Sequence, residues 1–384
     1  MCEIYYIEVV NKTKVMISPH EKQDKLIRAT DIEALSCRNN ANKKSYFPIY
    51  DPYIDSLIQS YNQYLKFCVG YSSSSAGRTL RSVFQEQKFP LINRGTYFRV
   101  ELINLLLNEF ILQFQRCQFV LLGSGSDTRA FYILSKNPHV KYIELDFPES
   151  LRIKKLSILS QESLRNITQI NEFQKSEISS KDQFFALDPD LHTPNYHLIG
   201  CDLRELRTES VSQRVLNCLD RTLPTLVLSE CVLCYLDPID NTNIINFWKD
   251  NLSESSFVCF VIYEPMCLND PFGRVMKENL AHRGLNLITF SEFPDPISRF
   301  NFLTKECCLV NVKVTNMSAI AGYSGSLQNS WFLESESMRI NNLELVDEIE
   351  EIKLLLDHYT VCYGEYSSKN ITLKNISQWN WILK

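Results

Sequence analysis

The 384-residue sequence contains no run of about 20 apolar residues, which is the length that a membrane-spanning helix requires. We also expect no secretory signal peptide, because Glu3 and Glu8 fall where a basic start and a long apolar stretch would be needed. We therefore predict a cytoplasmic protein, a monomer with no membrane partner.

Basic residues are not in excess. The chain has 40 Lys and Arg against 45 Asp and Glu, a formal net charge of −5, and the two signs are mixed along the sequence. Nucleic-acid-binding proteins usually carry a basic patch, so we expect no nucleic-acid partner.

The sequence also lacks a recognisable metal motif. Cys231 and Cys234 form a C-x-x-C pair, but no second pair lies at zinc-ligand spacing. The 13 cysteines are scattered through segments that are predicted to be core strands and helices. We interpret them as reduced, buried side chains and expect no metal.

Short apolar runs alternate with amphipathic stretches in the second part of the chain. Strands that alternate with helices form βαβ units around a parallel sheet, so the pattern predicts the α/β class. The predicted strands are 119–122, 140–145, 196–199, 223–229 and 257–263, followed by 309–314 and 358–363 with a helix at 343–356 between them.

The first part of the chain has a different pattern. It predicts an N-terminal arm with one short helix at 31–37, helices at 51–67 and 95–114, and a serine-rich loop at 72–77. We divide the chain into an arm and helical lid, 1–115, and a core, 116–384. The core contains a polar insertion at about 161–195, which we expect to be a surface loop.

Polar residues and glycines follow four of the predicted strands. In open parallel sheets, ligands bind at these carboxyl ends. The first end carries Gly123 and Gly125, whose lack of a Cβ allows a sharp turn and close approach of a ligand. Thr128 stands where a dinucleotide-binding loop has its third glycine, which disfavours an NAD-dependent oxidoreductase.

Three acidic residues end the next strands, and each has a structural alternative. Asp146 can accept the hydroxyls of a ribose or begin the helix at Pro148. Asp202 can accept from an adenine amino group or cap a helix near Arg204. Glu230 needs a cationic partner, since a buried carboxylate is costly alone. That partner is either the ammonium of a bound methionine moiety or a structural arginine, Arg99 or Arg129.

Together these motifs resemble the leucine carboxyl methyltransferases, which methylate the C-terminal leucine of the protein phosphatase 2A catalytic subunit. The matching segments are Gly-x-Gly-x-Asp-Thr at 123–128, Glu-x-Asp-Phe-Pro at 144–148, Asp-Leu-Arg at 202–204 and Glu-Cys-Val-Leu-x-Tyr at 230–235. Flanking matches include Asn-Arg-Gly-Thr-Tyr-Phe-Arg at 93–99 and extend over nearly the whole chain.

The resemblance implies a class I, Rossmann-like sheet that binds S-adenosylmethionine, and it assigns donor-binding roles to individual residues. These are Arg99 for the methionine carboxylate, Gly123 in the loop, Asp146 for the ribose, Asp202 and Leu203 for the adenine, and Glu230 for the ammonium. Arg38 aligns with a family lysine, and the following polar stretch, 39–44, departs from the apolar family pattern.

The implied reaction needs no general base. A peptide α-carboxylate has a pKa of about 3.5 and is already a nucleophile at neutral pH. We therefore expect no catalytic side chain and name the protein phosphatase 2A catalytic subunit as the partner. The alternatives are a carboxyl methyltransferase with another substrate and a non-catalytic protein that binds S-adenosylmethionine. A related tRNA-modifying family carries a β-propeller, for which the sequence after the last predicted strand is too short.

Overall fold

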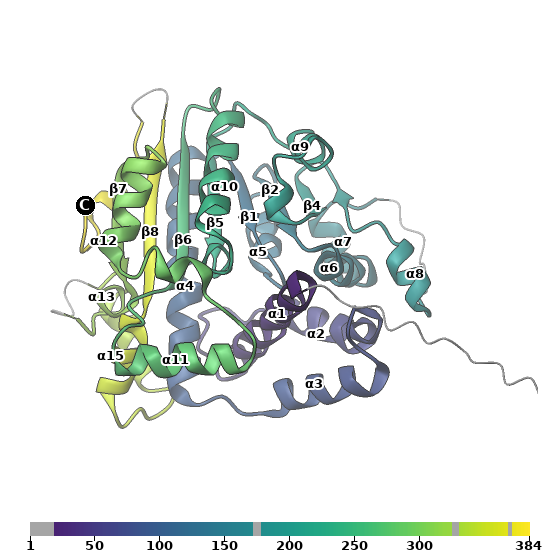
Figure 1. Ribbon diagram of the computed structural model, residues 1–384, viewed down its shortest axis with the longest axis horizontal. Helices are drawn as coiled ribbons and strands as arrows, with labels where there is room; N and C mark the ends of the chain where they lie inside the picture. The colour runs from purple at the N-terminus through teal and green to yellow at the C-terminus, as the bar shows by residue number, and fades with distance from the viewer. Residues whose placement is uncertain (1–18, 172–177, 325–329, 368–370) are drawn as a thin grey trace, which may run out of the picture.

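The computed structural model describes residues 19–171, 178–324, 330–367 and 371–384. Within these ranges the strands form one eight-stranded sheet with the order β3-β4-β2-β1-β5-β6-β8-β7 (Figure 1). The strands are β1 (Gln118–Leu122), β2 (Lys141–Asp146), β3 (Leu191–His192), β4 (Tyr196–Gly200), β5 (Thr225–Glu230), β6 (Val258–Pro265), β7 (Val310–Asn316) and β8 (Tyr359–Tyr366).

The five central strands, from β4 to β6, are parallel, which confirms the predicted sheet. β8 pairs antiparallel with both β6 and β7, and the short β3, which the sequence did not predict, pairs antiparallel with β4. From β1 the chain proceeds outward to β2 and β4 and then returns to β5 on the other side. The strand order therefore reverses between β1 and β5, where open α/β sheets form their ligand sites.

Helices cover both faces of the sheet and one end of it (Figure 1). They are α1 (Pro19–Lys43), α2 (Tyr53–Tyr64), α3 (Ser73–Gln85), α4 (Pro90–Phe114), α5 (Arg129–Lys136), α6 (Pro148–Ser160), α7 (Glu162–Ile167), α8 (Lys181–Ala186), α9 (Glu209–Leu216), α10 (Pro238–Asn251), α11 (Pro271–His282), α12 (Pro296–Asn301), α13 (Met317–Ile320), α14 (Glu334–Asn341) and α15 (Ile349–Asp357). Several begin at proline, whose fixed φ and missing N–H suit the first helical position. No helix in the described ranges is long and apolar enough to cross a membrane.

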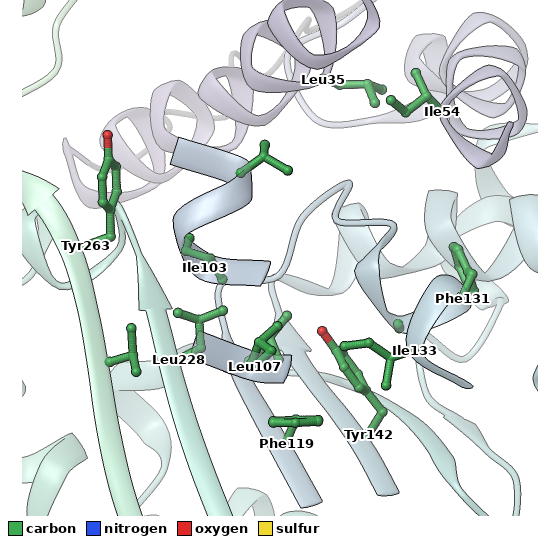
Figure 2. Close-up of a cluster of buried hydrophobic side chains, with 14 of the residues drawn as sticks. Leu35, Ile54, Ile103, Leu107, Phe119, Phe131, Ile133, Tyr142, Leu228 and Tyr263 are labelled. Atoms are coloured by element: carbon green, nitrogen blue, oxygen red, sulfur yellow. The ribbon is translucent and has the colours of Figure 1, made fainter. Parts of the chain in front are cut away.

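The sheet separates two hydrophobic clusters. Alternate strand residues face opposite sides, so Phe119 packs in one cluster and Val120 in the other. Figure 2 shows the first cluster, in which Ile103 and Leu107 of α4 lie against the sheet near Phe119 and Leu228. α4 thus shares a core with the strands, and so do α1, α2 and α3, which lie at the end of the sheet (Figure 1). The division at 115/116 stays a prediction.

The prediction of a short helix at 31–37 was wrong in the length of the helix, because α1 extends over 25 residues. Its inward face includes Ile32 and Leu35, but also the buried polar residues Asn39 and Asn42. Asn42 exchanges two hydrogen bonds with the backbone of Asp51. Polar residues on a buried face obscure the apolar periodicity by which a helix is predicted.

Three other predictions need correction. The serine-rich segment at 72–77 is not a loop: Ser72 caps α3 in a capping box with Ser75. The polar insertion contains α7, α8 and β3, and its residues 172–177 lie outside the described ranges. The helix predicted at 343–356 begins only at Ile349.

Candidate active site

A cavity of about 450 Å³ opens at the carboxyl ends of the central strands, next to α1. Its volume lies within the range of about 300–1,000 Å³ that is common for small-molecule sites. All seven residues that the sequence singled out line it: Arg38, Arg99, Gly123, Asp146, Asp202, Leu203 and Glu230. The folded chain therefore brings together side chains that come from α1, α4 and four strand ends.

The two loop glycines are required by neighbouring protein groups. Gly123 has a φ of +63°, and a Cβ there would lie 2.4 Å from Cγ2 of Val232. Gly125 has a φ of +44°, and its Cβ would lie 2.3 Å from Oδ1 of Asp31. Both values of φ fall in the left-handed region that glycine adopts without steric cost. The loop can thus pass between α1 and the segment after β5.

Asp146 joins the end of β2 to the glycine loop. One carboxylate oxygen accepts from the Gly125 amide at 2.6 Å and the other accepts from the Phe147 amide at 2.6 Å. Burial, and then the nearby Asp31 carboxylate, raise the pKa of Asp146 to about 6. The first helical residue after it is Pro148, and no side-chain bond caps α6. Each carboxylate oxygen keeps a lone pair for a further donor, such as a ribose hydroxyl.

Glu230 already has cationic partners in the folded chain. Its carboxylate accepts from Arg99 Nε at 2.5 Å and also pairs with Arg129. Burial on its own would raise the pKa of Glu230, but Arg129 and Arg99 outweigh it and lower the pKa to about 2. Arg99 also lies over the ring of Tyr263, with Cζ 5.3 Å from the ring centroid. In this structure, Glu230 therefore pairs with both of the arginines that the sequence offered as its structural partners.

Asp202 shows the capping geometry that was its alternative interpretation. Its carboxylate accepts from the Arg204 amide at 2.9 Å and pairs with the Arg204 guanidinium. Arg204 in turn pairs with Asp24 of α1 at 2.9 Å. Leu203 is buried beside it, 7% exposed. Capping and contact with a ligand are compatible, since both residues also line the cavity.

Arg38 extends from α1 into a polar cluster at the start of α5. It donates to the Thr128 hydroxyl at 2.5 Å and lies 3.5 Å from an Asp51 carboxylate oxygen. Asp127 lies 3.6 Å away on its other side. Arg38 thus ties α1 to the loop that follows β1, in addition to lining the cavity.

Sequence reasoning missed Asp31, which holds α1 against the glycine loop. Its carboxylate accepts from the Ser126 amide at 2.7 Å and the Ser126 hydroxyl at 2.6 Å, and also from the Tyr61 hydroxyl. Asp31 lies 95 residues away from Ser126 in the sequence. No motif surrounds it, so only the packing of α1 reveals this role.

The wall of the cavity beyond Glu230 contains aromatic and aliphatic side chains. Tyr263 and Tyr359 stack with ring centroids 5.6 Å apart. Met276 and Leu280 of α11, and Leu287 shortly after it, also line the cavity. Burial raises the pKa values of both tyrosine hydroxyls above their usual range, so these groups stay protonated at neutral pH. None of the histidines in the described ranges lines the cavity.

The fold and the site together define a class of enzyme. A parallel sheet whose order reverses at β1 and β5, with an antiparallel β8 inserted between β6 and β7, is the class I methyltransferase topology. The glycine loop and the acidic strand ends lie at the reversal of strand order, where open α/β sheets bind their ligands.

Comparison with known protein sequences identifies the family. The sequence model of the leucine carboxyl methyltransferase family matches residues 27–249. Proteins called leucine carboxyl methyltransferase 1 are similar to this chain: that of Debaryomyces hansenii is 53% identical over 96% of this chain and all of its own length, and that of Candida albicans is 47% identical over the same shares. Among solved structures, an S-adenosylmethionine-dependent methyltransferase from Archaeoglobus fulgidus overlaps with 70% of this chain and 94% of its own, at a TM-score of 0.34 and 14% identity.

The chain belongs to the leucine carboxyl methyltransferase family. It is an S-adenosylmethionine-dependent methyltransferase, and the reaction of its family is methyl transfer to a leucine carboxyl group.

Proposed function

We propose that this enzyme transfers a methyl group from S-adenosylmethionine to the C-terminal leucine α-carboxylate of the protein phosphatase 2A catalytic subunit. The observation that carries the proposal is the pairing of Arg99 with Glu230 beside an apolar wall. A methionine zwitterion offers one charge to each of these side chains. Their mutual ion pair is then replaced by two ion pairs to the ligand, without leaving a buried charge alone.

The apolar wall of the cavity suits a carboxylate acceptor, because the tyrosines and the cysteine that line it offer no base. The lining tyrosines are kept protonated by burial, and burial raises the pKa of Cys231 to about 11. A carboxylate of pKa about 3.5 needs no proton removed. The chain's contribution is then to orient the two reactants and exclude water from them.

The positions of the residues support the proposed donor contacts. We propose that Asp146 accepts the ribose hydroxyls and that Asp202 and Leu203 contact the adenine, since they end neighbouring strands β2 and β4. Gly123 is proposed to contact the ligand from the loop that follows β1, since it lines the cavity there. Arg38 is proposed to support this site from α1, because its guanidinium is held between Asp51 and Asp127.

The test is incubation of the purified enzyme with labelled S-adenosylmethionine and the purified phosphatase catalytic subunit. We expect about one base-labile methyl group per phosphatase, located at the C-terminal leucine. A phosphatase with an amidated C-terminus should accept none, because its nucleophile is gone. Label that appears at lysine or arginine, or a bound donor without any transfer, would contradict the proposal.

A further inference from the structure

We propose that His192, His197 and Cys218 form a binding site for one zinc ion at the β3–β4 edge of the sheet. None of the three lines the donor cavity. Among the histidine, cysteine and acidic side chains in the described part of the chain, these three form the group whose ligand atoms are close enough together to hold one metal ion. The atoms all lie within 4.8 Å of one another.

The site is built by a hairpin and the end of a helix. His192 of β3 and His197 of β4 are direct cross-strand partners, and their ring centroids are 5.6 Å apart. Cys218 follows α9, and its Sγ lies 3.4 Å from His192 Nδ1. A tetrahedral zinc ion, with bonds of ~2.3 Å to sulfur and ~2.1 Å to nitrogen, holds such a pair about 3.6 Å apart. The observed spacing therefore needs little adjustment.

His197 supplies independent evidence that a partner is missing. The residue is 7% exposed, and both of its ring nitrogens are buried without a hydrogen-bond partner among the described residues. Buried polar groups of native proteins are nearly always paired. The neutral imidazole ring, with an unprotonated nitrogen, is the form that binds metals. A metal ion would satisfy one of these nitrogens.

Asp190 lies near the second ring nitrogen of His192, beyond direct hydrogen-bonding distance. Asp190 Oδ2 lies 3.8 Å from His192 Nε2, on the opposite side of the ring from Cys218. Metal-binding histidines usually direct their second nitrogen to a carboxylate, which fixes the ring and its tautomer. Asp190 is itself held by Arg214 at 2.6 Å and by the Gly200 amide at 2.8 Å.

The ligand types select the metal. Two imidazoles and a thiolate suit Zn²⁺, whereas Mg²⁺ and Ca²⁺ prefer oxygen. The side chain of His192 is 48% exposed, which provides an entry path and room for water as a fourth ligand. Zinc binds the thiolate form of cysteine, so coordination would displace the Cys218 thiol proton.

A bound ion would join three separate segments. It would tie the hairpin to the end of α9, 26 residues further along the chain. Through Asp190 and the Gly200 amide, the same connection reaches the end of β4, directly before Cys201 and Asp202. We assign the ion a structural role at this edge, separate from methyl transfer.

The test uses untagged, chelator-treated full-length enzyme. Calorimetric titration with ZnSO₄ should show one ion per chain, and CoCl₂ should produce a thiolate-to-cobalt charge-transfer band. Zinc should also raise the melting temperature. Cys218→Ser should abolish the band, and His192→Gln should weaken zinc binding at least about tenfold. Because His192 is half-exposed, its variant keeps the test valid even if buried His197 variants fail to fold.

Two matched controls alter exposed residues of the same types. Cys308→Ser and His139→Gln should bind zinc like the wild type, since both side chains are exposed and neither belongs to the cluster. Absence of stoichiometric binding, or a cobalt band that persists in Cys218→Ser, would overturn the proposal.

Discussion

Two carboxylates lie close together at the donor side of the cavity, and they differ in their surroundings. Asp31 receives three hydrogen bonds from Ser126 and Tyr61. Asp146 receives two, from Gly125 and Phe147, and its pKa is raised to about 6 by burial and by Asp31. Asp146 therefore changes its charge within an experimentally accessible pH range.

We predict that affinity for S-adenosylmethionine depends on this ionisation. Ribose hydroxyls donate to the carboxylate form, so binding must remove a proton from Asp146 below pH 6. Lowering the pH from 7 to 5 should then weaken binding roughly tenfold. Calorimetric titration at several pH values measures this. Asp146→Asn should bind weakly and without that pH dependence, and a wild-type affinity that is constant from pH 5 to 7 would contradict the assigned role.

The ion pair between Arg99 and Glu230 leads to a second prediction. Arg99→Ala and Glu230→Ala should each reduce donor affinity, but the double variant should lose less than the sum, because the two side chains contact each other. A double-mutant cycle on the dissociation constant gives the coupling. Fully additive losses would show that the two residues act separately.

The free energy of unfolding of the Glu230→Ala variant tests the same ion pair. Among the described residues, Glu230→Ala removes the one carboxylate that pairs with Arg99 and leaves Arg129 paired with Asp127 alone, and breaking a buried ion pair costs about 3–5 kcal/mol. The lowered pKa of Glu230, about 2, means that its pairing stabilises the fold above pH 4.5 and is lost as the pH falls toward 2. Urea unfolding at pH 7 should therefore show a larger loss for Glu230→Ala than at pH 2.

At the scale of elements, α1 and the glycine loop pack closely because Gly125 has no Cβ. A side chain at position 125 would occupy the place of the Asp31 carboxylate. This close approach explains why a helix with a weak apolar pattern still docks firmly at its middle.

We predict that Gly125→Ala destabilises the protein and that Asp31→Ala partly compensates. The left-handed φ of +44° costs about 1–2 kcal/mol with a side chain, and the clash with Asp31 adds to it. Only the clash is relieved in the double variant, so the two changes should be less than additive in the free energy of unfolding. Gly77→Ala, inside α3, is the control and should be neutral or slightly stabilising. Additive changes would contradict the proposed contact.

The elements differ in how far the sequence could predict them. The central strands are mainly apolar because helices cover both of their faces, so their pattern is clear even where a buried polar residue such as Glu144 interrupts it. α1 was underestimated because Asn39 and Asn42 face the protein interior. α3 was missed because its serine-rich start resembles a loop, although the serines form a cap. β3 contains two residues, too few for any periodicity.

For the molecule as a whole, the candidate site was predictable because parallel strands end at one edge. Gly123, Asp146, Asp202 and Glu230 could be placed together from their positions after predicted strands. Asp31 could not, since its partners come from tertiary packing over a separation of 95 residues. His192, His197 and Cys218 were missed for the same reason: a cross-strand pair and a helix end bring them together, without a sequence motif.

The whole-molecule prediction concerns the acceptor. At saturating donor, the single-turnover rate should be nearly constant from about pH 6 to 8, because the attacking carboxylate is ionised throughout. Intact phosphatase should react faster than a short leucine-ended peptide, since remote contacts can supply orientation. Rapid-quench measurements with both acceptors test this. A rate that rises tenfold per pH unit would reveal a base.

The two halves of α1 are held by different forces. Leu35 and Ala41 are buried in the core, whereas the links made by Asp24, Arg28 and Glu33 are ion pairs at or near the surface. Such pairs contribute little and weaken with salt. We therefore expect the first half of this helix to detach from the cavity more readily than the second half. Salt concentration should then govern how readily the donor enters and leaves, before it affects whether the protein remains folded.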